Sequence, residues 1–151
     1  MQNNYRVLFF GTDELSAAAL QTLIDLNVNI VGVITRADKE QGRKKEIVFS
    51  DVKKLALQHN LNLLQPIKLR EEINKILDLK PDLILTCSYG KIIPEEIINY
   101  PQFKSVNIHP SLLPKYRGAS PIQSAILNND IEPGVKFLYM TKDLDHGNIL
   151  F

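Results

Sequence analysis

Short runs of apolar, β-branched residues alternate with segments of helical periodicity along most of this chain. Residues 82–87 are the strongest strand signal, because a parallel strand that is buried on both faces is apolar almost throughout. We expect other strands at residues 6–10, 29–34, 61–64 and 134–140. Strand–helix–strand units are joined by right-handed crossovers, so the sequence predicts an α/β fold built on a doubly wound, mostly parallel sheet.

Capping residues indicate where the helices between these strands begin. Thr12 or Asp13 can cap the first helix, and Ser50 can cap a later one. Pro94 suits the first turn of another helix, because a proline there has no backbone N–H to lose. The Ser-Pro pair at residues 120–121 carries both signals and predicts a further helix.

The composition is that of an ordinary globular protein, with 44% hydrophobic and 23% charged residues in 151. The formal net charge of +1 shows no overall basic excess, so any contact with nucleic acid must come from a local patch. The single cysteine, Cys87, excludes an internal disulfide and, beside an apolar run, indicates a buried inert thiol. Because membrane-length apolar runs and a signal-peptide pattern are both missing from the sequence, we expect a cytoplasmic protein without membrane contact.

Residues 36–48 interrupt the alternation with a long, polar and strongly charged connection. Connections in α/β units usually have about 2–6 residues, so a longer one favours a binding role. A solvated loop without a function is an equally good interpretation of the sequence alone.

Asn107 and His109 end a short β-branched strand and are followed by a loop that contains prolines. Strand alternation places both side chains on one face, at the strand end where an open α/β sheet holds its chemistry. An amide can donate to a developing oxyanion, and an imidazole can carry a proton. The alternative is structural, since a strand-end Asn can tie a turn and a His can be a satisfied buried group.

A second polar element, residues 142–147, forms a glycine-terminated turn between the strands expected at 134–140 and 148–151. If the sheet stays parallel, this turn lies beside the end of the strand that carries His109. A carboxylate would then meet the imidazole and the amide, as proton transfer at a carbonyl requires. Asp143 and Asp145 compete for that role. We expect no metal site, because no clustered Cys/His ligand spacing accompanies these residues.

Several motifs in order along the whole chain resemble the folate-dependent formyltransferases, the clearest being Asn-x-His followed by Ser-Leu-Leu-Pro. The matching segments are residues 11–13, 41–45, 88–94, 107–114, 117–123 and 144–147. Within the family, the resemblance is to the N-terminal catalytic domain of the methionyl-tRNA formyltransferases. It implies the Rossmann-like fold of that family.

The resemblance also implies an activity, namely transfer of a formyl group from 10-formyltetrahydrofolate to the amino group of methionine on initiator tRNA. The implied partners are the folate co-substrate and initiator methionyl-tRNA, without a metal, and the full-length protein would be a monomer. Residues 1–151 would be a catalytic domain that is incomplete at its C-terminal end and lacks the family's C-terminal tRNA-binding domain.

The resemblance assigns roles to individual residues. Asn107 would polarise the formyl oxygen, His109 would move a proton, and Asp145, the acid of the Leu-Asp-x-Gly turn, would pair with His109. The implied folate-binding residues are Lys91, Ile92, Ile93, Ser111, Leu112, Leu113, Pro114 and Asp143. The implied tRNA-binding residues are Arg43, Lys44 and Lys45.

Three other functions remain open at this point. Glycinamide ribonucleotide transformylase shares the Asn-Ile-His-Pro motif but carries a Gly/Ser-rich phosphate loop after its first strand, which this sequence lacks. A formyltetrahydrofolate hydrolase shares Arg-Gly-Ala-Ser at 117–120 but differs at 121–123. An inactive folate-binding fragment is the third alternative.

Overall fold

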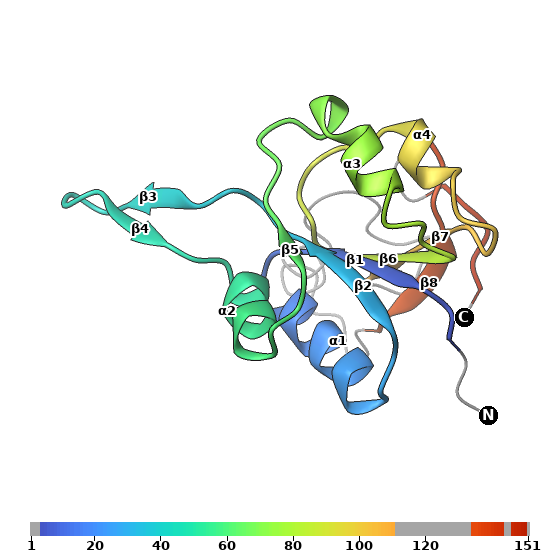
Figure 1. The fold of residues 1–151 in the computed structure, drawn as a ribbon, viewed down its shortest axis with the longest axis horizontal. Helices are drawn as coiled ribbons and strands as arrows, with labels where there is room; N and C mark the ends of the chain where they lie inside the picture. Colours follow the sequence, from blue (N-terminus) through green and yellow to red (C-terminus); the bar gives the residue numbers. More distant parts are fainter. Residues whose placement is uncertain (1–3, 111–133, 144–145, 151) are drawn as a thin grey trace.

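The computed structural model describes residues 4–110, 134–143 and 146–150, and within these ranges the chain forms a six-stranded sheet in the order β5-β2-β1-β6-β7-β8 (Figure 1). The strands are β1 Val7–Gly11, β2 Ile30–Ile34, β5 Leu63–Leu64, β6 Leu83–Cys87, β7 Ser105–His109 and β8 Lys136–Tyr139. Pairing is parallel from β5 to β7. The doubly wound, mostly parallel α/β sheet is therefore confirmed.

Helices cover both faces of this sheet (Figure 1). On one face lie α1 (Glu14–Asp25) and α2 (Asp51–Gln58), which contribute to a core with Phe9 and Val33. On the other lie α3 (Ile73–Leu77) and α4 (Glu95–Ile98), and a 3₁₀ turn at Leu69–Glu71 precedes α3. Burial of apolar side chains on both sides explains why the inner strands are apolar on successive residues.

Two of the predicted helix caps are present. The carboxylate of Asp13 accepts from the backbone N–H of Ser16 at 3.0 Å, which decides between Thr12 and Asp13. The hydroxyl of Ser50 accepts from the N–H of Lys53 at 3.0 Å. Pro94 occupies the N-cap position of α4, one residue earlier than expected. The helix predicted from residues 120–121 lies outside the described residues.

The connection at residues 36–48 is in part regular structure and not only a loop. It contains an antiparallel ribbon of β3 (Lys39–Gln41) and β4 (Glu46–Val48), which projects away from the sheet (Figure 1). Gly42 begins its turn with φ of +75°, and the N–H of Lys45 donates to the Gly42 carbonyl at 3.2 Å. Glycine adopts this left-handed backbone without a steric penalty, so the turn closes the hairpin.

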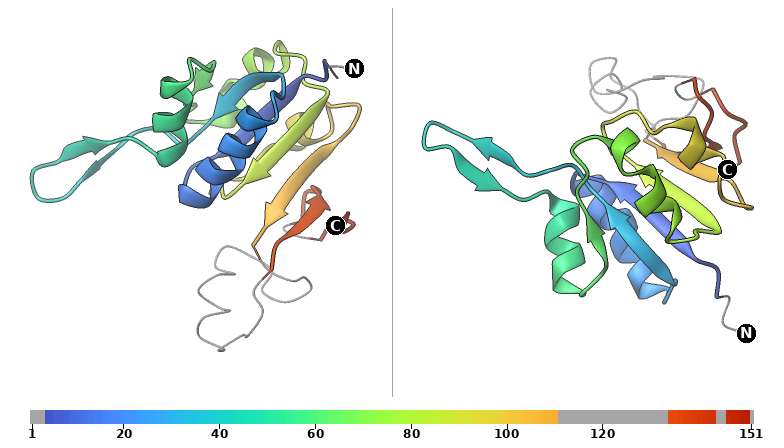
Figure 2. Two further views of the ribbon diagram at one scale, coloured as in Figure 1. Left: turned by 90° about the horizontal axis from the view of Figure 1, so that it is seen from below. Right: turned by 45° about the horizontal axis from the view of Figure 1, so that its top comes forward.

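The direction of strand β8 differs from the expectation that the sheet stays parallel. It pairs antiparallel with β7, so that Lys136 lies opposite His109 and Tyr139 lies opposite Val106. Figure 2 shows β8 running back alongside β7. Residues 148–150 then return along β8, since the N–H of Tyr139 donates to the carbonyl of Asn148 at 2.9 Å.

Candidate active site at the carboxyl edge of the sheet

The carboxyl ends of β1, β6 and β7 lie next to one another at one edge of the sheet. Strand order reverses between β1 and β6, and open α/β sheets bind their ligands at such a switch point. Here the two strands are joined beyond their ends, because the hydroxyl of Thr12 donates to the carbonyl of Tyr89 at 3.0 Å. Gly11 lies too close to its neighbours for a side chain, since a Cβ there would be 2.9 Å from the Cys87 carbonyl.

Asn107 and His109 point to the same face of β7, as predicted. Ile108 between them belongs to the core under α1 and α2, so its neighbours face the side of α3 and α4. His109 is the last residue of the strand and is only 3% exposed, whereas Asn107 is half-buried. The structure therefore places an amide and a buried imidazole side by side at the carboxyl edge.

The carboxamide of Asn107 is held by the neighbouring strand. Thr86 of β6 lies in register with it, and the Thr86 hydroxyl donates to Asn107 Oδ1 at 2.7 Å. This bond engages the oxygen of the amide and therefore fixes the orientation of the carboxamide, whose NH₂ half is its donor. Donation by an amide is the interaction that a developing oxyanion requires.

The described parts of the turn at residues 142–147 do not lie where a parallel sheet would have put them. The N–H of Met140 donates to the Ser105 carbonyl at 2.8 Å, so the end of β8 lies at the amino end of β7. Asp143, just beyond, is exposed, and its carbonyl accepts from the hydroxyl of Thr141. About 13 Å of strand separates Ser105 from His109, at about 3.3 Å per residue. Asp143 and His109 are thus not brought together, and Asp145 lies outside the described residues.

The predicted folate-binding residues are described in part. Lys91 is tied to a neighbouring loop, since its Nζ donates to the carbonyls of Ile67 at 2.9 Å and Pro66 at 3.3 Å. Ile92 is 85% exposed and Ile93 is buried, so this stretch offers one apolar side chain to solvent. Residues 111–114 lie outside the described residues. Folate binding by the residues of this predicted set remains a prediction.

Arg36 and Tyr89, which the sequence alone did not indicate, also lie at this edge. A Cβ on Gly90 would come within 3.6 Å of Arg36 Nη1, so the guanidinium of Arg36 covers the Gly90 backbone. Within the part of the chain that the structure describes, Arg36 Nε and the hydroxyl of Tyr89 are both buried without a hydrogen-bond partner. Burial raises the pKa of Tyr89 to about 12, against the opposing effect of the Arg36 charge. The position of Arg36 just after a predicted strand was the signal that could have found it.

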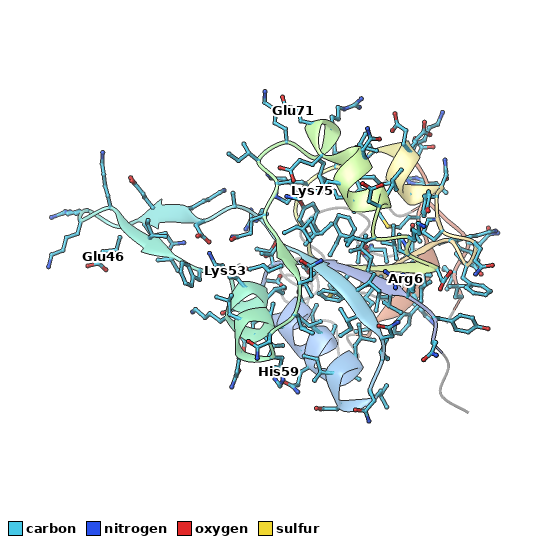
Figure 3. The ribbon with its side chains drawn as sticks, viewed as in Figure 1. Arg6, Glu46, Lys53, His59, Glu71 and Lys75 are labelled. Carbon is cyan, nitrogen blue, oxygen red and sulfur yellow. The ribbon has the colours of Figure 1, made fainter. Side chains whose placement is uncertain are left out.

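Lys53 of α2 holds the base of the ribbon in place. Figure 3 shows Lys53 at the point where the ribbon joins that helix. Lys53 Nζ lies 2.6 Å from a carboxylate oxygen of Asp38 and 3.8 Å from the ring centroid of Phe49. The hydrogen bond from Lys53 holds the pKa of Asp38 below its usual value, and Gln65 adds a second. At the other end of the ribbon, the predicted tRNA-binding residues are exposed: Arg43, Lys44 and Lys45.

Cys87 is buried, as expected, and the Ser16 hydroxyl donates to its carbonyl. Burial raises the pKa of its thiol to about 11, which keeps it protonated near neutral pH and unsuited to act as a nucleophile. Across residues 4–110, 134–143 and 146–150, no three His, Cys, Asp or Glu side chains are grouped to hold a metal ion. Over the same ranges, no helix is long and apolar enough to cross a membrane.

Fold and site together define an α/β protein of the doubly wound class with an amide–imidazole pair at the carboxyl edge of its sheet. Residues 5–151 match the family model described as formyl transferase, and the chain belongs to that family. A methionyl-tRNA formyltransferase from Ureaplasma urealyticum is 45% identical over 148 residues, covering 97% of this chain and 48% of the relative. The corresponding protein from Dictyoglomus thermophilum is 46% identical over 147 residues, covering 95% and 47%.

The chain thus spans about half the length of the curated relatives that it matches. Among solved structures, glycinamide ribonucleotide transformylase 1 from Geobacillus kaustophilus superposes with a TM-score of 0.76 at 21% identity, covering 99% of this chain and 81% of that one. At this identity the likeness concerns the fold alone, and it supports the Rossmann-like arrangement of the sheet.

Proposed function

We propose that the full-length protein carrying this chain transfers a formyl group from 10-formyltetrahydrofolate to the amino group of methionyl initiator tRNA. The observation that carries the proposal is the pair formed by Asn107, with its amide oxygen held by Thr86, and the buried His109. The names of relatives at 42–46% identity support tRNA as the acceptor. On this proposal, residues 1–151 belong to a cytoplasmic catalytic domain.

The chemistry requires no covalent bond to the protein. The methionyl amine attacks the formyl carbon, and the NH₂ group of Asn107 donates to the oxygen as it gains negative charge. The amine nitrogen must then lose a proton, and the folate nitrogen must gain one as its bond to carbon breaks. His109 can carry that proton, and Asp145 is proposed to stabilise the protonated imidazole.

The folate is proposed to bind beside this pair. Its pocket would be lined by Lys91, Ile92, Ile93, Ser111, Leu112, Leu113, Pro114 and Asp143. The bond from Lys91 to the carbonyl of Ile67 supports a fixed wall at this point, because it ties the loop after β6 to the loop after β5. Of the described members of this set, Asp143 is the least well placed, since it lies past the amino end of β7.

The ribbon of β3 and β4 is proposed to contact the tRNA backbone. Its tip is exposed and carries three successive cations, Arg43, Lys44 and Lys45, on a chain whose formal net charge is only +1. A cluster of this kind attracts phosphates locally without making the whole protein basic. The brace from Lys53 to Asp38 and Phe49 supports the ribbon as a fixed arm.

Replacing Arg43, Lys44 and Lys45 together by glutamine should raise KM for tRNA and flatten its dependence on salt. Each phosphate contact contributes about one unit to the slope of log affinity against log salt concentration, so we expect the slope to fall by about two to three. Binding of a folate analogue should be unchanged. Initial rates measured from low to moderate salt test this expectation.

A matched control removes the same charge elsewhere. Lys68, Lys75 and Lys80 are exposed and lie on or near α3, away from the ribbon, as Figure 3 shows for Lys75. Their triple change to glutamine should leave the salt slope as it is in the wild type. Equal slopes for the two triple variants would mean that the ribbon contributes only net charge.

The acceptor itself is tested by a competition assay on the full-length protein. We expect formyl transfer from 10-formyltetrahydrofolate to charged initiator tRNA, and no appreciable transfer to glycinamide ribonucleotide or to water. Transfer to glycinamide ribonucleotide or water in preference to tRNA would identify one of the alternative enzymes. Folate binding without turnover on any acceptor would favour a protein that only binds folate.

A further inference from the structure

On the face covered by α3 and α4, one row of side chains crosses the sheet. Two polar residues interrupt this otherwise apolar row. Register joins six residues in the order Leu64, Ile34, Phe10, Thr86, Asn107 and Leu138. All except Thr86 and Asn107 are buried hydrophobic residues. A polar pair in an apolar layer is costly unless each group finds a partner, so the contact between these two is a specific feature.

Thr86 has one proton to donate, and two acceptors lie within reach. Asn107 Oδ1 is 2.7 Å from the hydroxyl, whereas the sulfur of Met140 is 3.5 Å away. A thioether is a weak acceptor, so the proton goes to the amide oxygen. Thr86 is only 3% exposed, which keeps water from replacing that bond.

The bond decides which half of the carboxamide can face a reacting carbonyl group. The terminal torsion of asparagine has a broad, roughly two-fold preference, so the side chain alone does not choose between oxygen and nitrogen. Only the NH₂ half stabilises an oxyanion, and the reversed amide would oppose negative charge with its oxygen. A donor fixed on the next strand selects the productive orientation before substrate arrives.

We infer that Thr86 is a positioning residue, whose hydroxyl holds the amide oxygen of Asn107 and so directs the amide nitrogen toward the formyl oxygen. The inference rests on the proposed formyl transfer and adds a second strand to its catalytic machinery. Thr86 itself acts only through Asn107, and its loss should therefore affect the rate of the chemical step more than the binding of substrates.

Three variants of the full-length protein separate this role from a structural one. Thr86→Val keeps the shape and removes the hydroxyl, and it should lower kcat about 10- to 100-fold, with KM for folate and tRNA within about twofold. Thr86→Ser should restore most of the rate. Ser105→Ala is the matched control, because Ser105 lies on β7 and its buried hydroxyl donates to the Ile98 carbonyl at 2.7 Å. This control should keep the wild-type kcat.

The variant Asn107→Ala provides the decisive background for this test. If Thr86 acts through Asn107, adding Thr86→Val to Asn107→Ala should change kcat by less than about twofold, because neighbours in one network are not additive. An undiminished loss in the double variant would overturn the inference, as would a wild-type kcat for Thr86→Val alone.

A spectroscopic measurement separates failure of this inference from failure of the proposed function. With asparagine labelled by nitrogen-15, the Asn107 carboxamide signal is identified as the one missing from Asn107→Ala. In Thr86→Val its order should fall, while it stays unchanged in Ser105→Ala. An inactive wild type would contradict formyl transfer, and an unchanged carboxamide in Thr86→Val would refute the positioning role by itself.

Discussion

Replacing Asn107 or His109 by alanine in the full-length protein should lower the rate of formyl transfer by at least about 100-fold in each case. Removal of one oxyanion donor typically costs a factor of about 10²–10³, and removal of a general acid–base about 10²–10⁴. Both groups act on charge and protons that develop during the reaction. Folate affinity should therefore change much less than kcat. Single-turnover rates with saturating folate measure the chemical step directly.

The chain offers a matched control for each substitution. Asn62 also uses its amide to bond a sheet backbone, donating to the Val31 carbonyl at 3.2 Å, but it lies at the opposite side of the sheet. His59 ends α2 and is exposed. Alanine at either position should leave the rate near that of the wild type. If Asn107→Ala or His109→Ala behaved like these controls, the carboxyl edge of β7 would not be the catalytic site.

Features that depend on neighbouring residues were predictable from the sequence. The cap at Ser50 requires only a hydroxyl before an amphipathic run, and β6 requires only an apolar run of strand length. The shared face of Asn107 and His109 follows from strand alternation. Asn107 and His109 can therefore be selected as candidates from the sequence alone, and their catalytic role remains a prediction.

Features set by distant partners were not predictable in the same way. The direction of β8 depends on how the chain returns to β7, and neither strand's sequence states whether the pairing is parallel or antiparallel. The bond from Thr86 to Asn107 links residues 21 apart in sequence, and it was missed because each belongs to a separate strand signal. The length and charge of residues 36–48 favour a loop, and a single glycine at Gly42 does not by itself predict the ribbon.

Replacing Asp145 by asparagine should lower formyl transfer by at least about 100-fold, while Asp143→Asn should stay within about threefold of the wild type. An amide keeps the size of the carboxylate but cannot balance the charge of a protonated imidazole or hold a proton. The Leu-Asp-x-Gly turn of the family selects Asp145, and the exposed Asp143 lies far from His109 along β7. The pair of isosteric variants is its own control, since both remove one negative charge from the same turn.

The antiparallel pairing of β8 separates the described part of this turn from His109. The described parts of the turn lie at the amino end of β7, and His109 lies at its carboxyl end. A large loss in Asp145→Asn alone would assign the acid to Asp145 and separate its role from that of Asp143, which lies past the amino end of β7. Equal, small effects in both variants would instead leave His109 as the proton carrier without help from this turn. A larger loss in Asp143→Asn would reverse the assignment of the acid.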